Sequence, residues 1–338
     1  MNWTGLLKWS LAQHDGTKEC EIPQLSEDQK VWLKEAMESC VIDEVKEMKV
    51  ILKTLESKIK DSEISEDVRS EECVELIEGL IDLLVNSDSG INFCKIGGPI
   101  LMFDCIFDPN ISENVKIKAC RMISESTQNN HFVQDFISKL DFWKLMAVAS
   151  SKTVQKELAL ASISALSAIL KGNNMVNKRV FVNNNGIEFI KSMIINSTDD
   201  KILAKTFSIL SDLLYFKEHM AYDALIIQNQ NDKLALNPEL KMFVDKIEDH
   251  ENEIFEQLKL KFSSILTDKT PRKQFLRFTY IDCIKAMFEN QKKENKYSES
   301  LWKPLLIDLR ILEQEFEKLS KKDDFYETEY ANLKTFFY

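Results

Sequence analysis

The sequence predicts an all-α protein, an armadillo-like or HEAT-like right-handed superhelical solenoid with helical caps at both ends. Two observations favour this class. Apolar residues recur at helical spacing along most of the chain, and one order of helices occurs in three aligned copies followed by a looser fourth. Only 8 Gly and 6 Pro occur in 338 residues, with 44% hydrophobic and 29% charged side chains. This composition is typical of a mostly helical protein.

The clearest copy spans residues 114–150. It contains three runs of apolar residues at helical spacing, around Cys120, Val133 and Met146. Three short helices that are apolar on one side cannot bury those sides alone. We therefore expect further copies to pack on both flanks.

Those copies are found at residues 73–107 and 157–195, each with a long apolar helix, a polar break and two shorter helices. Gly98, Asp141 and Gly186 hold equivalent places, 43 and then 45 residues apart. A period of about 40 to 47 residues belongs to armadillo and HEAT repeats.

The looser fourth copy begins at Lys201. Together with the preceding copies it gives a predicted repeat region of residues 68–228. Residues 25–67 are predicted to form N-terminal capping helices, because Ser26 is a good N-cap and apolar residues follow at helical spacing. A terminal repeat without such a cap would expose its core face to water.

Residues 229–338 are predicted to form irregular C-terminal helical repeats and a cap. We expect a break at 266–273, which contains Pro271, then a helix at 274–288, a mobile polar loop at 291–300 and two last helices within 301–337.

Residues 1–24 are predicted to be a flexible N-terminal segment that carries a short apolar stretch. Its apolar side chains include Trp3, Leu6, Leu7 and Trp9. Two exposed tryptophans are unusual unless they dock on something. They either pack back on the first helices or bind another molecule, and the sequence leaves both possibilities open.

Charge and cysteine content restrict the functional class. The net charge of −11 argues against nucleic-acid binding, which needs clustered Lys and Arg. The 7 cysteines form no CxxC pair, so a reducing compartment is expected, with Cys73, Cys94, Cys105 and Cys120 as small core residues. No apolar run is long enough for a membrane span or a signal peptide, and we expect a cytoplasmic protein.

Motifs for catalysis are missing from the sequence. No GxGxxG, GxxxxGK[ST], HExxH or GxSxG pattern occurs, and the four histidines lie far apart. The acidic pairs Asp199-Asp200 and Asp323-Asp324 lie at predicted helix starts, where they compensate the helix dipole. We expect a binding protein rather than an enzyme, with no catalytic residue, cofactor or metal.

One polar triplet, Gln128, Asn129 and Asn130, separates two apolar helices. It is interpreted either as a loop that caps the next helix or as a contact for a partner. In the second interpretation, residues 86–89 and 171–174 at the equivalent turns line the same edge.

Several segments resemble one family. LLKWSLAQHDGT at 6–17 resembles the amino terminus of the Fes-type cytosolic exchange factors, and LSEDQKVWLKEAMES at 25–39 is similar to the opening helix of the animal heat-shock-protein-70-binding protein. Further matching segments lie at 86–94, 116–130, 140–150, 204–214 and 323–337. The likeness covers nearly the whole chain, in order and in spacing.

The resemblance implies a nucleotide exchange factor for cytosolic heat shock protein 70 chaperones. In that family the concave solenoid face embraces lobe II of the chaperone's ATPase domain and loosens lobe I, so that ADP leaves. The alternative is an armadillo adaptor that joins proteins without affecting exchange. We expect a monomer that binds neither nucleic acid nor membrane.

The resemblance also implies site residues. Asp88, Ser89 and Gly90 match the family's Asp-Asn-Ala turn, although Ser-Gly replaces Asn-Ala, and Lys205 falls at a basic position of the fourth repeat. Fungal members free substrate from the chaperone with a flexible amino-terminal segment, a role that residues 1–18 would fill here. The chain ends in Lys-Thr-Phe-Phe-Tyr without an ER-retention signal, which favours the cytosolic branch.

Overall fold

The computed structural model describes residues 26–28, 30–32, 43–60, 65–84, 87–172, 174–230, 238–266, 273–293, 299–321 and 327–334. Every regular element in this part of the chain is a helix. The chain divides into two units, Met1–Glu47 and Met48–Tyr338.

The first unit contains a short helical stretch that begins after Ser26. The amide of Lys30 donates to the Ser26 carbonyl at 2.9 Å, and the Lys30 ammonium pairs with Glu27 at 2.7 Å. The predicted helix start is therefore confirmed. The predicted flexible segment 1–24, with Trp3, Leu6, Leu7 and Trp9, lies outside the described residues.

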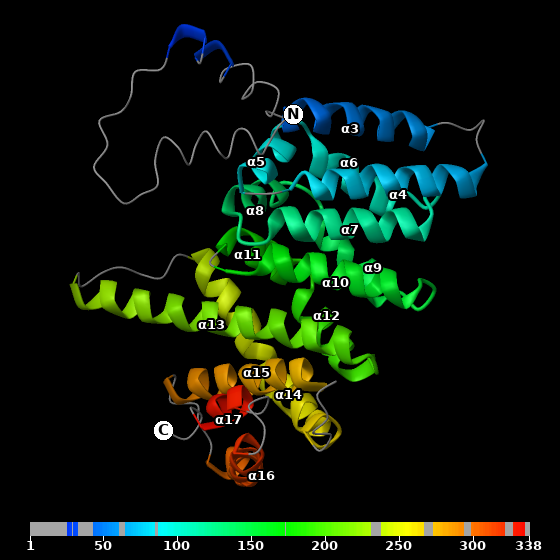
Figure 1. Cartoon of the computed structure of the whole chain (residues 1–338). Helices are drawn as coiled ribbons and strands as arrows, with labels where there is room; N and C mark the ends of the chain where they lie inside the picture. The colour runs from blue at the N-terminus through cyan, green and yellow to red at the C-terminus, as the bar shows by residue number, and fades with distance from the viewer. Residues whose placement is uncertain are drawn as a thin grey trace. The chain divides into compact units, whose positions relative to one another are not determined.

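The remaining elements run in chain order to the C-terminal region (Figure 1). Their bounds are α3 (Glu44–Lys60), α4 (Glu66–Asp82), α5 (Ser87–Lys95), α6 (Gly98–Phe107), α7 (Glu113–Thr127), α8 (His131–Ile137), η1 (Phe142–Lys144), α9 (Leu145–Ser150), α10 (Lys156–Leu170), α11 (Met175–Asn183), α12 (Gly186–Asn196), α13 (Asp200–Gln230), α14 (Pro238–Leu266), α15 (Gln274–Lys293), α16 (Glu299–Ser320) and α17 (Glu327–Lys334).

The long helices α4, α7, α10, α13 and α15 pack on one another in that order and form a row (Figure 1). Side-chain contacts join the starts of the two helices in each neighbouring pair, and in three of the pairs positions farther along are also in contact, so the helices run parallel. These contacts join Ser70 to Ser112, Glu78 to Lys118, Glu113 to Gln155, Cys120 to Ser162, Lys156 to Asp199, Asp200 to Lys273 and Phe207 to Tyr280. Partners in the first four contacts are separated by 40 or 42 residues, which agrees with the sequence repeat.

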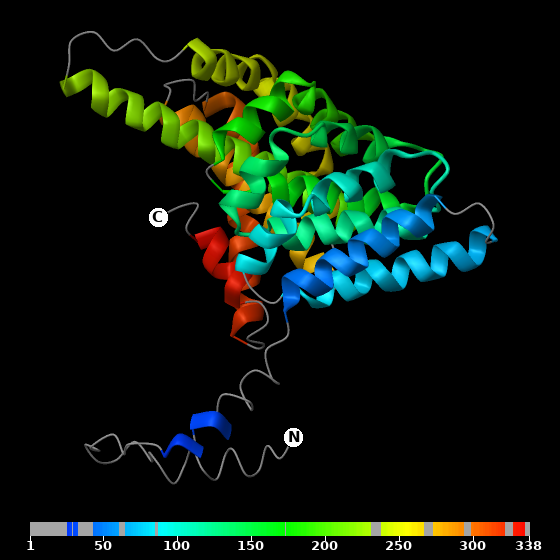
Figure 2. The ribbon, with the colours of Figure 1, turned by 90° about the horizontal axis from the view of Figure 1, so that it is seen from above.

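Shorter helices follow each of the first three long ones. α5 packs on α8 and α8 on α11, while α9 packs on α12. The predicted order of three helices is thus confirmed in each of the three aligned copies. At the start of the row, α3 lies beside α4 in both views (Figures 1 and 2), and Lys58 of α3 pairs with Glu72 of α4 at 2.7 Å.

Glycines at equivalent positions have an equivalent packing role. A Cβ on Gly98 would lie 2.0 Å from the ring of Phe93, and one on Gly186 would lie 2.4 Å from the ring of Phe181. Both phenylalanines are fully buried. Each glycine therefore lets an aromatic ring from the preceding short helix pack against the start of the next helix.

The second copy departs from this arrangement at Asp141. The equivalent ring, Phe136, is only partly buried, and the next helix begins with the 3-10 turn η1 rather than directly with α9. Asp141 is exposed, at the position where the other two copies have a glycine.

Two further expectations need adjustment. The fourth copy has no triplet, because α13 continues for 31 residues as a single helix and α14 follows it. The C-terminal helix α15 extends to Lys293, beyond the expected end at 288. The break between α14 and α15 and the two last helices, α16 and α17, agree with the prediction. Residues 294–298 of the predicted mobile loop, and Asp323-Asp324, lie outside the described residues, whereas residues 291–293 and 299–300 of that loop are helical.

The core runs along the whole row. Its members include five free cysteines, Cys73, Cys94, Cys105, Cys120 and Cys283, all buried. Burial raises the pKa of the Cys94, Cys105 and Cys120 thiols to about 12. The four cysteines expected in the core are confirmed there.

Candidate partner-binding surface

The long helices share one polar stripe, which we call the long-helix face. On each helix its positions are separated alternately by four and three residues, a spacing that keeps them on one side. The face comprises Glu71, Glu75, Glu78 and Asp82 of α4; Asn114, Lys118, Arg121, Glu125 and Gln128 of α7; Glu157, Ala161, Ser164, Ala168 and Lys171 at α10; and Lys201, Lys205, Ser208, Asp212 and Tyr215 of α13. All except Ala168 are exposed or half-buried.

Charges on the α4 and α7 part of the face are largely paired. Lys118 pairs with Glu78 across the two helices, and Arg121 pairs with Glu125 at 2.7 Å. The pKa of Arg121 is raised, first by Glu125 and to a smaller extent by Glu78 and Asp82. This part of the face is acidic, because α4 presents only carboxylates.

The α10 and α13 part of the face carries three lysines without ion pairs. Within the described residues, no carboxylate lies within ion-pair distance of the ammonium groups of Lys171, Lys201 or Lys205. Burial lowers the pKa of Lys205, and the neighbouring charge of Lys171 lowers it further. A partly desolvated ammonium beside another positive charge is unfavourable, and a carboxylate from a partner would relieve it.

Lys178 of α11 is a buried lysine whose charge interacts with that of Asp212 on α13. The ammonium of Lys178 on α11 donates to the Leu170 carbonyl and lies 5.4 Å from the ring centre of Phe216. Burial lowers the Lys178 pKa to about 8, against the attraction of Asp212 on α13. Burial raises the pKa of Asp212, while Lys178 and then Lys171 oppose that change. Asp212 thus compensates Lys178 first and is not free for Lys205.

The first turns of α5, α8 and α11 lie along one side of the long-helix face and form what we call the polar edge. Asn130 caps α8 by accepting from Val133 N at 3.3 Å, and it donates to the Ser87 carbonyl of α5 at 2.9 Å. Asn174 repeats this role on α11, accepting from Asn177 N at 3.0 Å and donating to Asp135. The side-chain amides of Asn130 and Asn174 therefore each link one copy of the repeat to the copy before it.

This geometry separates the predicted site residues into two groups. Ser89, Gly90 and Asn130 are buried, and Asn130 serves the capping interpretation of the triplet. Four predicted residues remain accessible to a partner: Asp88, Gln128 and Asn129 are exposed, and Lys205 is half-buried. One expectation needs correction, because residues 88–90 lie in the first helical turn of α5 rather than in a loop turn.

Lys171 connects the two predicted contact regions, the polar edge and the part of α13 around Lys205. Gln134 of the polar edge donates to the Lys171 carbonyl at 3.2 Å, while the Lys171 charge acts on Lys205. Lys171 therefore belongs both to the end of the polar edge and to the long-helix face. Whether a partner contacts these residues stays a prediction.

Sequence analysis alone did not identify Lys201, Asp212 or the side chain of Lys171 as parts of this surface. The signal was the stripe of polar residues at steps of four and three, repeated in register in each copy. The parallel packing of the long helices turns these separate stripes into one surface.

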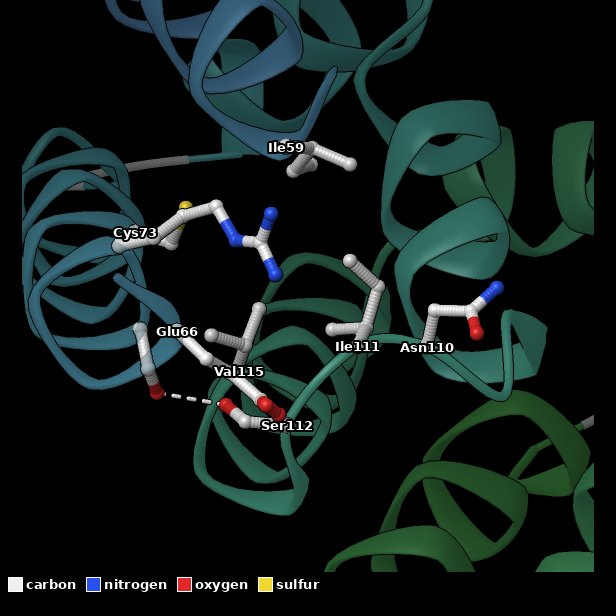
Figure 3. Close-up of a pocket in the computed structure, with 9 residues that line it drawn as sticks. Ile59, Glu66, Cys73, Asn110, Ile111, Ser112 and Val115 are labelled. Carbon is white, nitrogen blue, oxygen red and sulfur yellow. Dashed lines mark hydrogen bonds between the residues drawn. The ribbon is translucent and has the colours of Figure 1, made fainter. Parts of the chain in front are cut away.

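The surface lies apart from the described cavities. Figure 3 shows a small pocket among Ile59, Glu66, Cys73, Ile111 and Val115, next to the hydrogen bond of 2.5 Å between the hydroxyls of Ser70 and Ser112. Its volume of about 10 Å³ is enough for roughly one water molecule.

Two larger open grooves lie between other helices. One of about 390 Å³ is lined by residues of α3 and α6, including Lys53 and Ile100. The other, of about 430 Å³, lies beside Phe107, Lys144 and Val148. Neither groove contains a predicted site residue.

The described residues contain no group of three or more His, Cys, Asp or Glu side chains placed to hold a metal. No single described helix has the length and apolarity to cross a membrane; the pair α5 and α6, bent by 74°, passes that test by length and composition only.

No protein-family model matches the chain, and no curated protein matches its sequence.

Proposed function

We propose that this chain is a nucleotide exchange factor for a cytosolic heat shock protein 70, and that it binds lobe II of the chaperone's ATPase domain with the long-helix face. The family resemblance of the sequence suggests this function. Lys171, Lys201 and Lys205 of the long-helix face support it most directly, because no carboxylate among the described residues pairs with them. Such charges fit an acidic patch on a partner.

The proposal includes an armadillo-like right-handed superhelix whose concave side is the long-helix face. Parallel long helices that contact one another every 40 or 42 residues support this architecture. Repeats that contact only their neighbours produce extended concave surfaces of the kind needed to embrace a lobe.

Exchange by such a surface is a matter of differential binding. A factor that prefers the open nucleotide cleft by about 1.4 kcal/mol shifts the opening equilibrium about tenfold, whereas equal affinity for both states shifts nothing. No catalytic side chain, cofactor or metal of this chain takes part in the proposed mechanism. The lysines hold lobe II while the remaining bulk of the factor disfavours the closed position of lobe I.

Stopped-flow release of a fluorescent ADP analogue from a cytosolic heat shock protein 70 tests the proposal. The full chain should accelerate release strongly and in proportion to its occupancy of the chaperone. Binding without acceleration would contradict exchange and leave the armadillo adaptor as the function.

The adaptor is further distinguished by linkage. If the chain promotes ADP release through binding, bound ADP must weaken binding of the chain by the same factor. Titration of the ATPase domain with and without ADP measures this factor. An adaptor would bind equally in both conditions.

Lys205→Glu tests the position of the contact. Reversing this charge should weaken binding to the ATPase domain by at least about tenfold, because close charged contacts contribute 1.5 kcal/mol or more. Lys139→Glu is the matched control, since Lys139 is an exposed lysine after α8 and outside the long-helix face. Equal affinity of the folded Lys205 variant and wild type would remove Lys205 from the interface.

A further inference from the structure

The long-helix face continues onto α15, beyond the last predicted repeat. α13 and α15 run parallel: Asp200 pairs with Lys273 at 3.8 Å, and farther along Asn290 donates to the Leu214 carbonyl at 3.0 Å. The hydroxyl of Tyr215, a member of the face, donates to Asp282 of α15 at 2.9 Å. Asp282 therefore borders the same surface.

Phe275 lies two helical turns before Asp282 and thus on the same side of α15. Its side chain is 55% exposed, and it lies two residues after Lys273, whose ammonium pairs with Asp200 at the start of α13. Phe278, one turn along α15, is 39% exposed and extends the aromatic area to the adjoining side of the helix. Two neighbouring exposed phenylalanines are a marker of an interaction site.

We propose that Phe275 and Phe278 form a second contact with the same partner and bind an apolar side chain flanked by carboxylates. This inference rests on the proposed function, because it takes the chaperone's ATPase domain as the occupant. Charge complementarity favours that chemistry: Lys201 follows Asp200, the ion-pair partner of Lys273, and is exposed without an ion pair among the described residues, and Lys205 lies one turn farther along α13. Aromatic anchors beside unpaired positive charges are typical of binding hot spots.

Phe275→Ser combined with Phe278→Ser, in the full chain, tests the contact by calorimetric titration of the isolated ATPase domain. The double variant should raise the Kd at least about tenfold, as expected when central aromatic anchors are removed. The matched control is Ile307→Ser with Ile311→Ser on α16, since both isoleucines are 53% exposed and lie on a different helix. The control should bind as wild type does.

Two further readouts distinguish an apolar contact from a change of charge. The heat capacity change of binding should become less negative in the phenylalanine variant, because less apolar surface is buried. The Kd of the phenylalanine variant should depend on salt concentration as the Kd of wild type does. Lys201→Ala should reduce this dependence.

Three results would overturn the inference, and they are distinguishable. If wild type binds the ATPase domain and the phenylalanine variant binds equally well, the second contact fails while the proposed function stands. If wild type self-associates in sedimentation experiments and only this association is lost in the variant, the phenylalanines contact a second copy of the chain. If wild type does not bind the domain at all, the proposed function fails and this contact with it.

Discussion

Glycine residues in the helices of this protein have opposite roles depending on what surrounds them. Gly79 on α4 has room, since a Cβ there would meet only Ile51 at 3.8 Å. Gly90 on α5 has none, because a Cβ would lie 2.9 Å from the Asn130 amide nitrogen and 3.3 Å from the Ser126 carbonyl oxygen. Asn130 cannot move aside without losing its hydrogen bond to Ser87.

Gly90→Ala and Gly79→Ala should therefore change stability in opposite directions. In an open helix position, alanine stabilises by about 0.5 to 1 kcal/mol relative to glycine. At position 90 the crowding should outweigh this gain and destabilise by about 1 to 3 kcal/mol. Urea denaturation of both variants measures the difference. A stabilised Gly90 variant would show that Asn130 and its neighbours make room for the added methyl group.

Lys178 gives the protein a specific pH dependence. Its pKa falls from the ordinary 10.5 to about 8 because the ammonium is buried. The unfolded state therefore binds more protons than the folded state between pH 8 and 10.5, so this residue makes stability rise with pH across that window. The full effect amounts to about 3 kcal/mol.

Comparison of wild type with Lys178→Met isolates this effect. The free energy of unfolding of wild type minus that of the variant should increase from pH 8 towards pH 10.5, because the variant lacks the titrating group. The buried thiols, whose raised pKa values make stability fall with pH, are common to both proteins and cancel. A difference that does not vary with pH would exclude a buried ammonium at position 178.

At the scale of elements, hydrophobic periodicity predicted most helices, because burial of one face is a local property of the sequence. It did not predict that α13 would run through the fourth copy as one helix of 31 residues. It also did not predict that the third helix of the second copy would begin with the 3-10 turn η1, unlike the third helices of the other two copies.

Gly186→Ala tests the close contact between α11 and α12. The added Cβ would lie 2.4 Å from the Phe181 ring and 2.7 Å from the Phe181 carbonyl oxygen, so the substitution should destabilise by about 1 to 3 kcal/mol. Asp141→Ala at the equivalent place is the control. It removes only an exposed ion pair with Lys144 and should cost less than about 1 kcal/mol. Equal effects in urea denaturation would contradict the packing role of Gly186.

For the whole molecule, the two proposed activities should be separable. Deletion of residues 1–18 should leave ADP release nearly unchanged, since the long-helix face is intact, but should impair release of a bound peptide substrate from the chaperone. Fluorescence anisotropy of a labelled peptide measures the second activity. A full chain with serine in place of Trp3 and Trp9 keeps the length of the N-terminal segment and is the control for the deletion. Equal loss of both activities would contradict a separate N-terminal function.

Part of the candidate surface was predictable and part was not. Asp88, Gln128, Asn129 and Lys205 were identified from sequence and are accessible. Ser89, Gly90 and Asn130 were identified as well, but their side chains or backbone are used in packing and capping. Polar residue type alone does not tell whether an amide faces a partner or the neighbouring repeat.

The sequence by itself determined the all-helical class of the described residues, the order of three helices in each of three copies, the break before α15 and the burial of Cys73, Cys94, Cys105 and Cys120. These features depend on the spacing of apolar residues within a single helix. Only the tertiary structure decided that the charge of Lys171 acts on Lys205, that no described carboxylate pairs with these two lysines or with Lys201, that Lys178 is buried and that the helix of Phe275 packs on α13. Those relations join residues many positions apart, and they exist only because the long helices pack parallel and in register.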